Sequence, residues 1–260
     1  MTSRLISPVA VLIAVAGCLV PQYGTAQDHA VRILASNGMK GALEPLQTQC
    51  ERAIGHPVAL QFSSTAALKK RIEAGEGFDV TVIATEAIAD LIKQGKLAAD
   101  SRKDVARSEL GIGIRAGAAR PDIGSPEALK RALREAKSIT YPQDGATRGD
   151  IEKMFESLGI AADVKPKVVL APSSGAATES VASGKATFVL TLFSEIVPVA
   201  GTEILGPLPG AFRDAVHFQA AVSKTARNAE GAKTAVSFLT GPQAASVYKT
   251  KGLEPAASSK

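Results

Sequence analysis

The strongest constraint on the fold is a repeated order of short apolar run, small polar turn and amphipathic helix. Residues 62–84, FSSTAALKKRIEAGEGFDVTVIA, place Ser63, Ser64 and Thr65 between an apolar run and a basic helix. A helix N-terminus has unpaired backbone N–H groups and a partial positive charge, and hydroxyl groups there add hydrogen-bond donors for an anion. Taken alone, the turn favours a simple helix cap.

The same layout occurs upstream, in residues 31–46, VRILASNGMKGALEPL, where Ser36, Asn37 and Gly38 form the turn. In open α/β sheets, ligands bind beyond the carboxyl ends of the strands, where the first residues of successive helices meet. Two such turns therefore predict one anion-binding cleft.

Residues 1–26 resemble a secretory leader, with Arg4 ahead of an apolar run and a small-x-small cleavage pattern that ends at Ala26. We expect export to the periplasm and a mature chain that begins near Gln27. The sequence VAGC, which ends at Cys18, leaves a second possibility, because it resembles a lipobox whose cysteine is lipidated. We favour soluble export over this lipid anchor.

The composition excludes several other classes of protein. The 260 residues carry a formal charge of only +5, and the basic residues are scattered, which argues against a nucleic-acid partner. Beyond the leader Cys50 is the only cysteine, and we expect it to be a small buried hydrophobe. His29, His56 and His217 lack metal-ligand spacing, so we expect no metal and no cofactor.

Alternating strands and helices continue along the chain and predict an α/β protein. We expect two doubly wound α/β lobes, joined by two crossing segments, with a hinge and a cleft between the lobes. Residues 27–109 and 210–260 form lobe I in this prediction, and residues 110–209 form lobe II. The predicted strands are 31–35, 58–62, 80–84, 110–114, 138–141, 167–170, 187–192 and 215–222, and the predicted helices are 40–54, 65–74, 86–94, 126–136, 150–158, 175–183, 229–239 and 242–248.

Three glycines, Gly111, Gly113 and Gly117, have the spacing of a dinucleotide-binding loop. We reject that interpretation, because they lie within or after a strand and do not open a helix.

Two further small-residue turns precede helices in lobe II, at residues 145–149 and 173–176. From these turns we predict ligand contacts by Thr147, Arg148, Gly175 and Ala176. The Arg148 guanidinium is able to hold a carboxylate or a phosphate through two hydrogen bonds. A salt-bridged arginine at a helix start is an equally good interpretation.

Three motifs resemble periplasmic solute-binding proteins of the molybdate-binding type. Residues 62–85 are similar to that family's FxSSxxLxxQIEAGxPxDLFISA segment, residues 185–192 to its GEVDAGIVY strand, and residues 241–245 match its GPQAA motif. The resemblance covers nearly the whole mature chain. It implies the two-lobed type 2 periplasmic-binding fold and transport by an ABC importer.

In that family two serines, lobe II amides and a tyrosine hydroxyl hold the oxyanion. The resemblance puts Gly38 at the first serine, Thr65 next to Ser64 at the second, and Leu192 at the tyrosine. Two hydroxyl donors are therefore missing. Ser36, Asn37, Thr147 and Arg148 are possible substitute donors.

We therefore predict a monomeric, non-catalytic binding protein that captures a small anion for an ABC permease. Molybdate or tungstate is a leading candidate for this ligand, and an organic or phosphorylated anion is the alternative. A sensor or adaptor subunit is the other use of such a fold. We expect no enzyme activity, because no GxSxG elbow, paired-histidine motif or cysteine–histidine pair is found in the sequence.

Overall fold

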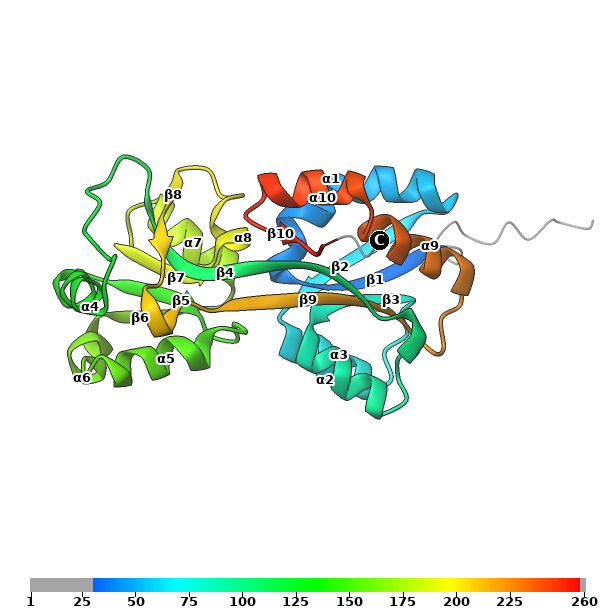
Figure 1. Ribbon diagram of the computed structural model, residues 1–260, viewed down its shortest axis with the longest axis horizontal. Coiled ribbons are helices and arrows are strands. Elements are labelled where there is room, and N and C mark those ends of the chain that lie inside the picture. The colour runs from blue at the N-terminus through cyan, green and yellow to red at the C-terminus, as the bar shows by residue number, and fades with distance from the viewer. Residues whose placement is uncertain (1–29, 258–260) are drawn as a thin grey trace, which may run out of the picture.

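The computed structural model describes residues 30–257, and the predicted leader, its cleavage position and Cys18 lie outside them. The described chain forms two α/β lobes joined by two long strands, as Figure 1 shows. This confirms the predicted fold class. Within the described residues no helix is long and apolar enough to cross a membrane.

In lobe I three parallel strands, β2, β1 and β3, lie side by side, and β9 is added antiparallel to β3. Helices cover both faces of this sheet (Figure 1). The elements are β1 (Val31–Ser36), α1 (Asn37–Ile54), β2 (Val58–Ser63), α2 (Thr65–Glu73), β3 (Val80–Ala84), α3 (Thr85–Lys93), β9 (Ala215–Val222), α9 (Ala229–Leu239), α10 (Pro242–Thr250) and β10 (Glu254–Pro255).

Lobe II repeats the arrangement around the parallel strands β7, β5 and β6. Its elements are α4 (Pro126–Glu135), β5 (Ile139–Pro142), α5 (Arg148–Ser157), α6 (Ala161–Val164), β6 (Val168–Ala171), α7 (Ser174–Ala182), β7 (Phe188–Leu192), α8 (Phe193–Ile196) and β8 (Thr202–Pro207). The sequence pattern left α6, α8, β8 and β10 unpredicted.

Strand β4 (Lys103–Arg115) belongs to both lobes. Residues 103–109 pair with β9, whereas residues 110–115 pair with β7 or β8. The strand therefore begins seven residues before the predicted start at Leu110. The division of the chain at residues 109 and 110 stays a proposal, which this change of partners supports.

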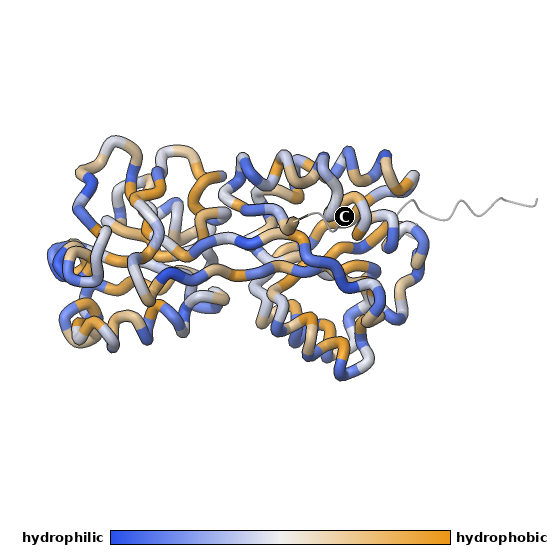
Figure 2. Tube along the Cα trace, in the orientation of Figure 1, coloured by the Kyte–Doolittle hydropathy of each residue, from blue (hydrophilic) through white to orange (hydrophobic). Residues whose placement is uncertain are grey.

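Each lobe has a hydrophobic cluster on both faces of its sheet. In lobe I, Met39, Leu43 and Leu46 of α1 pack in one cluster, and Leu68 and Ile88 pack in the other. Lobe II has one cluster under α4, α5 and α6 and a second under α7. Figure 2 shows apolar residues throughout both lobes and hydrophilic stretches on the strands that cross between them. Burial on both faces explains why the parallel strands are almost continuously apolar.

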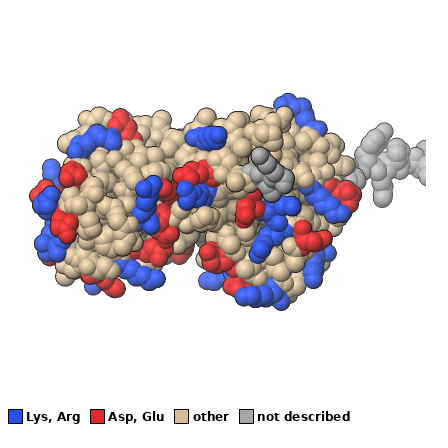
Figure 3. Space-filling view, in the orientation of Figure 1, with Lys and Arg blue, Asp and Glu red and all other residues tan. Residues whose placement is uncertain are grey.

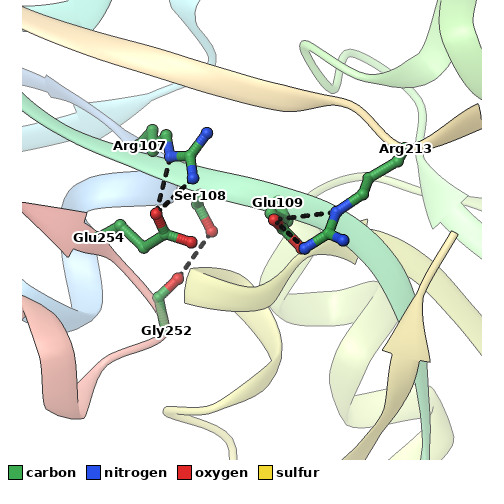
Figure 4. A network of polar contacts seen from close by, with 6 residues as sticks. All are labelled: Arg107, Ser108, Glu109, Arg213, Gly252 and Glu254. Atoms are coloured by element: carbon green, nitrogen blue, oxygen red, sulfur yellow. Dashed lines mark hydrogen bonds and ion pairs between the residues drawn. The ribbon is translucent and has the colours of Figure 1, made fainter.

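A polar network surrounds the point where β4 leaves lobe I (Figure 4). The Ser108 hydroxyl donates to the Gly252 carbonyl oxygen over 2.9 Å and accepts from the Ser194 backbone N–H over 3.0 Å. Nearby, Arg213 is paired with the nearly buried Glu109 at 2.8 Å. Ser108 thus joins the C-terminal part of lobe I to the short helix α8 of lobe II.

Gly111 and Gly113 lie inside β4, which agrees with our rejection of a dinucleotide-binding loop at these glycines. A side chain at Gly111 would collide with the Phe193 ring and would lie 2.6 Å from the Gly206 carbonyl oxygen. These glycines therefore let α8 and β8 pack closely against the crossing strand.

Candidate functional site

A cavity of about 300 Å³ lies between the two lobes. Five strand-to-helix turns meet at it: β1–α1, β2–α2, β5–α5, β6–α7 and β7–α8. Its lining consists of Ser36, Asn37, Phe62, Ser63, Ser64, Thr65, Ala67, Pro142, Asp144, Gly145, Ala146, Thr147, Pro172, Ser173, Ser174, Leu192 and Glu195. Five of the residues that the sequence predicted as ligand contacts are thus brought together.

The first turn has no intervening loop, because Ser36 ends β1 and Asn37 begins α1. The sequence predicted a helix start at Lys40, three residues too late. Ser36 is the N-cap residue, but its side chain makes no capping hydrogen bond. Its hydroxyl and the first N–H groups of α1 are therefore available to a ligand.

In the second turn one hydroxyl makes a capping hydrogen bond and the other makes only a long hydrogen bond. The Ser64 hydroxyl caps α2 and accepts the Ala67 N–H over 3.2 Å. The Thr65 hydroxyl accepts the Ala84 N–H over a long 3.4 Å. Both hydroxyls keep their own proton for donation, since each acts here as an acceptor.

Lobe II also contributes one N-cap hydroxyl that makes no capping hydrogen bond and one that does. Thr147 is the N-cap residue of α5, is buried, and makes no capping hydrogen bond. Ser173 caps α7 and accepts the Ala176 N–H over 3.2 Å. On each wall of the cavity one hydroxyl caps a helix and another remains free.

Gly38 lies behind the cavity wall and is absent from its lining. A Cβ atom at this position would lie 2.6 Å from the Phe218 ring and 3.1 Å from a Leu192 methyl group. The two departures from the resembled pattern, Gly38 and Leu192, therefore pack together. Leu192 and Phe218 fill the space that a serine side chain at position 38 would need. We call Gly38, Leu192 and Phe218 the apolar block.

Three other predicted contacts lie outside the lining. The Arg148 guanidinium donates to Glu152 over 2.8 Å and to the Gln143 carbonyl oxygen over 2.9 Å, and the hydrogen bond with Glu152 raises its pKa. Gly175 lines an adjoining cavity of about 290 Å³, and the Ala176 N–H is taken by Ser173. Their role as ligand contacts stays a prediction.

Sequence reasoning missed the two acidic residues of the lining, Asp144 and Glu195. Glu195 is the third residue of α8, three positions after the end of β7. A glutamate at that spacing typically turns back to the helix N-cap. That spacing was the available signal, but the helix itself is only four residues long and went unpredicted.

Glu195 lies among hydrogen-bond donors of its own lobe. The Thr191 hydroxyl donates to its carboxylate. Burial raises the pKa of Glu195, while hydrogen bonds from Thr191, from Ser174 and from the Leu192 N–H oppose that rise. The carboxyl group therefore takes up a proton more readily than an exposed glutamate does.

The structure places Cys50 as predicted, buried on α1, where burial raises its thiol pKa to about 11. Among residues 30–257 no group of three or more histidine, cysteine, aspartate or glutamate side chains is placed to hold a metal ion. On the face that Figure 3 shows, basic and acidic side chains are interspersed.

Comparison with known proteins agrees with this architecture. A family model described as bacterial extracellular solute-binding protein matches residues 31–254. An aconitate isomerase from a Pseudomonas species is 25% identical over 229 residues, which cover 86% of this chain and 87% of that protein. The molybdate-binding protein ModA of Azotobacter vinelandii is 24% identical over 232 residues, which cover 87% of this chain and 90% of that protein.

A solved structure of the periplasmic molybdate-binding protein of Azotobacter vinelandii has a TM-score of 0.72 against this chain, at 23% identity. The match covers 87% of this chain and 100% of that one. At this identity the match establishes a shared fold, and it leaves the ligand to be argued from the cavity itself.

Proposed function

The chain belongs to the bacterial extracellular solute-binding protein family, and from this premise we propose that its interlobe cavity captures a small organic anion bearing a carboxylate. The family's connection with ABC importers implies delivery of the ligand to a membrane permease. Ligand contact with both lobes would favour the closed arrangement, which such a permease distinguishes from the open one.

The observation that carries this proposal is the mixed lining of the cavity. Hydroxyl and N–H donors from the helix starts suit a carboxylate. Beside them lie Phe62, Pro142, Pro172 and Leu192, whose apolar surfaces suit a carbon skeleton. An inorganic oxyanion has no carbon to place against these surfaces.

The apolar block supports the same choice. It removes two hydroxyl donors from the positions that the resembled family uses for its oxyanion. A hydrogen bond to a charged group contributes about 1.5–3 kcal/mol, so the loss of two weakens a tetrahedral oxyanion by about two to four orders of magnitude.

The test is a thermal-shift and calorimetric screen of the chain from Gln27 onward. The panel contains molybdate, tungstate, sulfate, phosphate, organic phosphates, and mono-, di- and tricarboxylates including aconitate. Ligand at one hundred times its dissociation constant stabilises the folded state by about 2.7 kcal/mol. We expect a shift with a carboxylate and none with molybdate, tungstate or sulfate; a shift with molybdate alone would contradict the proposal.

A matched pair of variants locates the site. Ser36→Ala removes a cavity hydroxyl that makes no capping bond, so we expect about tenfold or greater loss of affinity with little loss of stability. Ser125→Ala is the control, because Ser125 caps α4 and is absent from the cavity lining. Equal affinities for the two variants would remove Ser36 from the site.

A second candidate is capture of molybdate or tungstate, which the similarity to a molybdate-binding protein favours. It predicts that the remaining hydroxyls and amides replace the two lost donors. The same screen decides between the two ligands.

A third candidate is catalysis on a bound acid. The similarity to an aconitate isomerase and the position of Glu195 in the cavity favour it, since a carboxyl beside a bound acid is able to move a proton. Incubation with aconitate followed by proton NMR tests it. Conversion of aconitate by the wild type, lost in the Glu195→Gln variant, would establish an enzyme. Aconitate that stays unchanged with the wild type would exclude this reaction.

A further inference from the structure

The cavity offers an anion two carboxyl groups and no basic side chain. Asp144 and Glu195 are the ionisable residues of its described lining, and the rest are neutral. Hydroxyl and N–H groups stabilise an anion, whereas an ionised carboxylate at the same cavity repels it. This conflict needs a physical resolution.

Glu195 is the better placed of the two acids to resolve it. Its carboxylate already has the Thr191 hydroxyl and further donors of lobe II around it. Burial makes the ionised form costly, and an anion bound in the same cavity adds to that cost. A proton on Glu195 removes the repulsion and gives the carboxyl an O–H donor for the ligand.

The charged groups around α8 do little to hold Glu195 ionised. Glu195 also borders the adjoining cavity, where α1 contributes Lys40 and Glu44 and α7 contributes Glu179. Lys40 is the basic residue of that lining, and its ammonium lies 3.8 Å from the Glu44 carboxylate. In the interlobe cavity the β5–α5 turn, which belongs to the same lobe, contributes Asp144, a further acid.

Two acids on the strands packed against α8, one on β4 and one on β8, have their own arginine partners. Glu109 of β4 is paired with Arg213 at 2.8 Å, and Glu203 of β8 is paired with Arg120 at 3.2 Å. Neither arginine is therefore left over as a counter-ion for Glu195.

We propose that Glu195 is a specificity-determining residue, which admits an anion to the cavity only together with one proton, shared between its carboxyl group and the ligand. This inference rests on the proposed anion-binding function. It names the ligand class more closely as anions of weak acids, such as carboxylates and phosphates, which are able to share one proton with the Glu195 carboxyl group. Anions of strong acids, such as sulfate, are excluded.

A purely structural role for Glu195 makes a different prediction. As the third residue of α8 it accepts the Leu192 N–H, which is the capping arrangement expected at that position. A residue that only caps the helix changes stability, but it does not couple ligand binding to proton uptake. Proton uptake is therefore the readout that separates the two roles.

The experiment is isothermal titration calorimetry of the chain from Gln27 onward with aconitate, inorganic phosphate and sulfate, from pH 5.5 to pH 8.5. At each pH, two buffers of different ionisation heat report the protons taken up. For aconitate or phosphate we expect uptake approaching one proton and an affinity that falls by on the order of tenfold per pH unit at the alkaline end. Sulfate should not bind.

Glu195→Gln keeps the shape and a hydrogen-bond donor but cannot ionise. We expect this variant to lose proton uptake and to gain sulfate affinity. Glu179→Gln, on the exposed side of the adjoining cavity, should behave as the wild type does. If Glu195→Gln does not fold, the two-buffer measurement on the wild type still decides.

Two failures are distinguishable. Normal binding of aconitate or phosphate without proton uptake, or a Glu195→Gln variant that keeps the uptake, would overturn the role of Glu195 and leave anion capture intact. Absence of binding by every anion in the wider panel, at every pH, would overturn the proposed function and the inference with it.

Discussion

The two walls of the cavity share their local structure and differ in their side chains. On the lobe I wall, the β1–α1 and β2–α2 turns present Ser36, Asn37, Ser64 and Thr65, all of them neutral. On the lobe II wall, three turns of the same kind present hydroxyls together with both acids of the lining. Each wall has one hydroxyl that caps a helix and at least one that does not.

This difference separates general anion binding from selection among anions. A strand followed at once by a helix supplies free N–H groups on either wall, whatever the anion. The acids on lobe II alone make one wall sensitive to the charge and protonation of the ligand. Glu195 also follows Ser194, whose N–H donates to the Ser108 hydroxyl on β4, so the selective wall is connected to the strand that crosses between the lobes.

The largest expected effect contrasts two glycines that occupy equivalent places on the walls. Gly38 is the second residue of α1, and Gly149 is the second residue of α5. A Cβ at Gly38 would lie 2.6 Å from the Phe218 ring, whereas one at Gly149 would meet nothing within 4 Å. Gly38→Ser should therefore destabilise the fold by about 1–3 kcal/mol in equilibrium urea unfolding.

Gly149→Ser is the matched control and should be neutral or slightly stabilising, because glycine loses more conformational entropy than serine when it takes up helical geometry. In a Phe218→Leu background, Gly38→Ser should cost less than it does in the wild type, since the ring that it meets is gone. Additive costs would contradict the packing account of the apolar block.

A smaller effect tests whether the walls are alike. Ser64 and Ser173 each accept the N–H of the third following residue over 3.2 Å. Ser64→Ala and Ser173→Ala should each lower the free energy of unfolding by about 0.5–2 kcal/mol, and by similar amounts. Ser36→Ala, which breaks no capping bond, should cost less. A clear inequality between the first two variants would mean that the turns differ structurally as well as chemically.

Most of the fold was predictable because it follows from local pattern. Apolar runs marked the buried strands. A glycine directly follows each of the predicted helices 40–54, 65–74 and 86–94, and these residues, Gly55, Gly75 and Gly95, have positive φ angles of 76°, 92° and 72°. The prediction failed where pairing decides structure. β4 begins at Lys103 because β9 provides a partner for its polar half, and residues 193–207 form α8 and β8 against the crossing strand.

The candidate site divides in the same way. Ser36, Asn37, Ser64, Thr65 and Thr147 were found from turn patterns, and the structure brings all five to one cavity. Long-range packing, which sequence spacing does not record, decided Gly38, because Phe218 lies 180 positions from it in the chain and yet fixes the wall behind it. A local contact decided Arg148, since Glu152, four residues along the same helix, engages it outside the cavity lining.

The smallest expected effect tests the acid that distinguishes the lobe II wall. Burial raises the pKa of Glu195 above its ordinary 4.5, so the folded state binds this proton more readily than the unfolded state does. Its contribution to stability is complete below pH 4.5 and is lost as the pH rises through the folded pKa.

On acidification from neutral pH, the wild type should therefore gain stability relative to Glu195→Gln, as measured by urea unfolding of both proteins at each pH. Because Glu195 is only partly shielded from solvent and three hydrogen bonds oppose the shift, the difference should be modest. A difference that changes in the opposite direction would mean that the hydrogen-bond donors outweigh burial, and that the selective wall holds Glu195 as an anion.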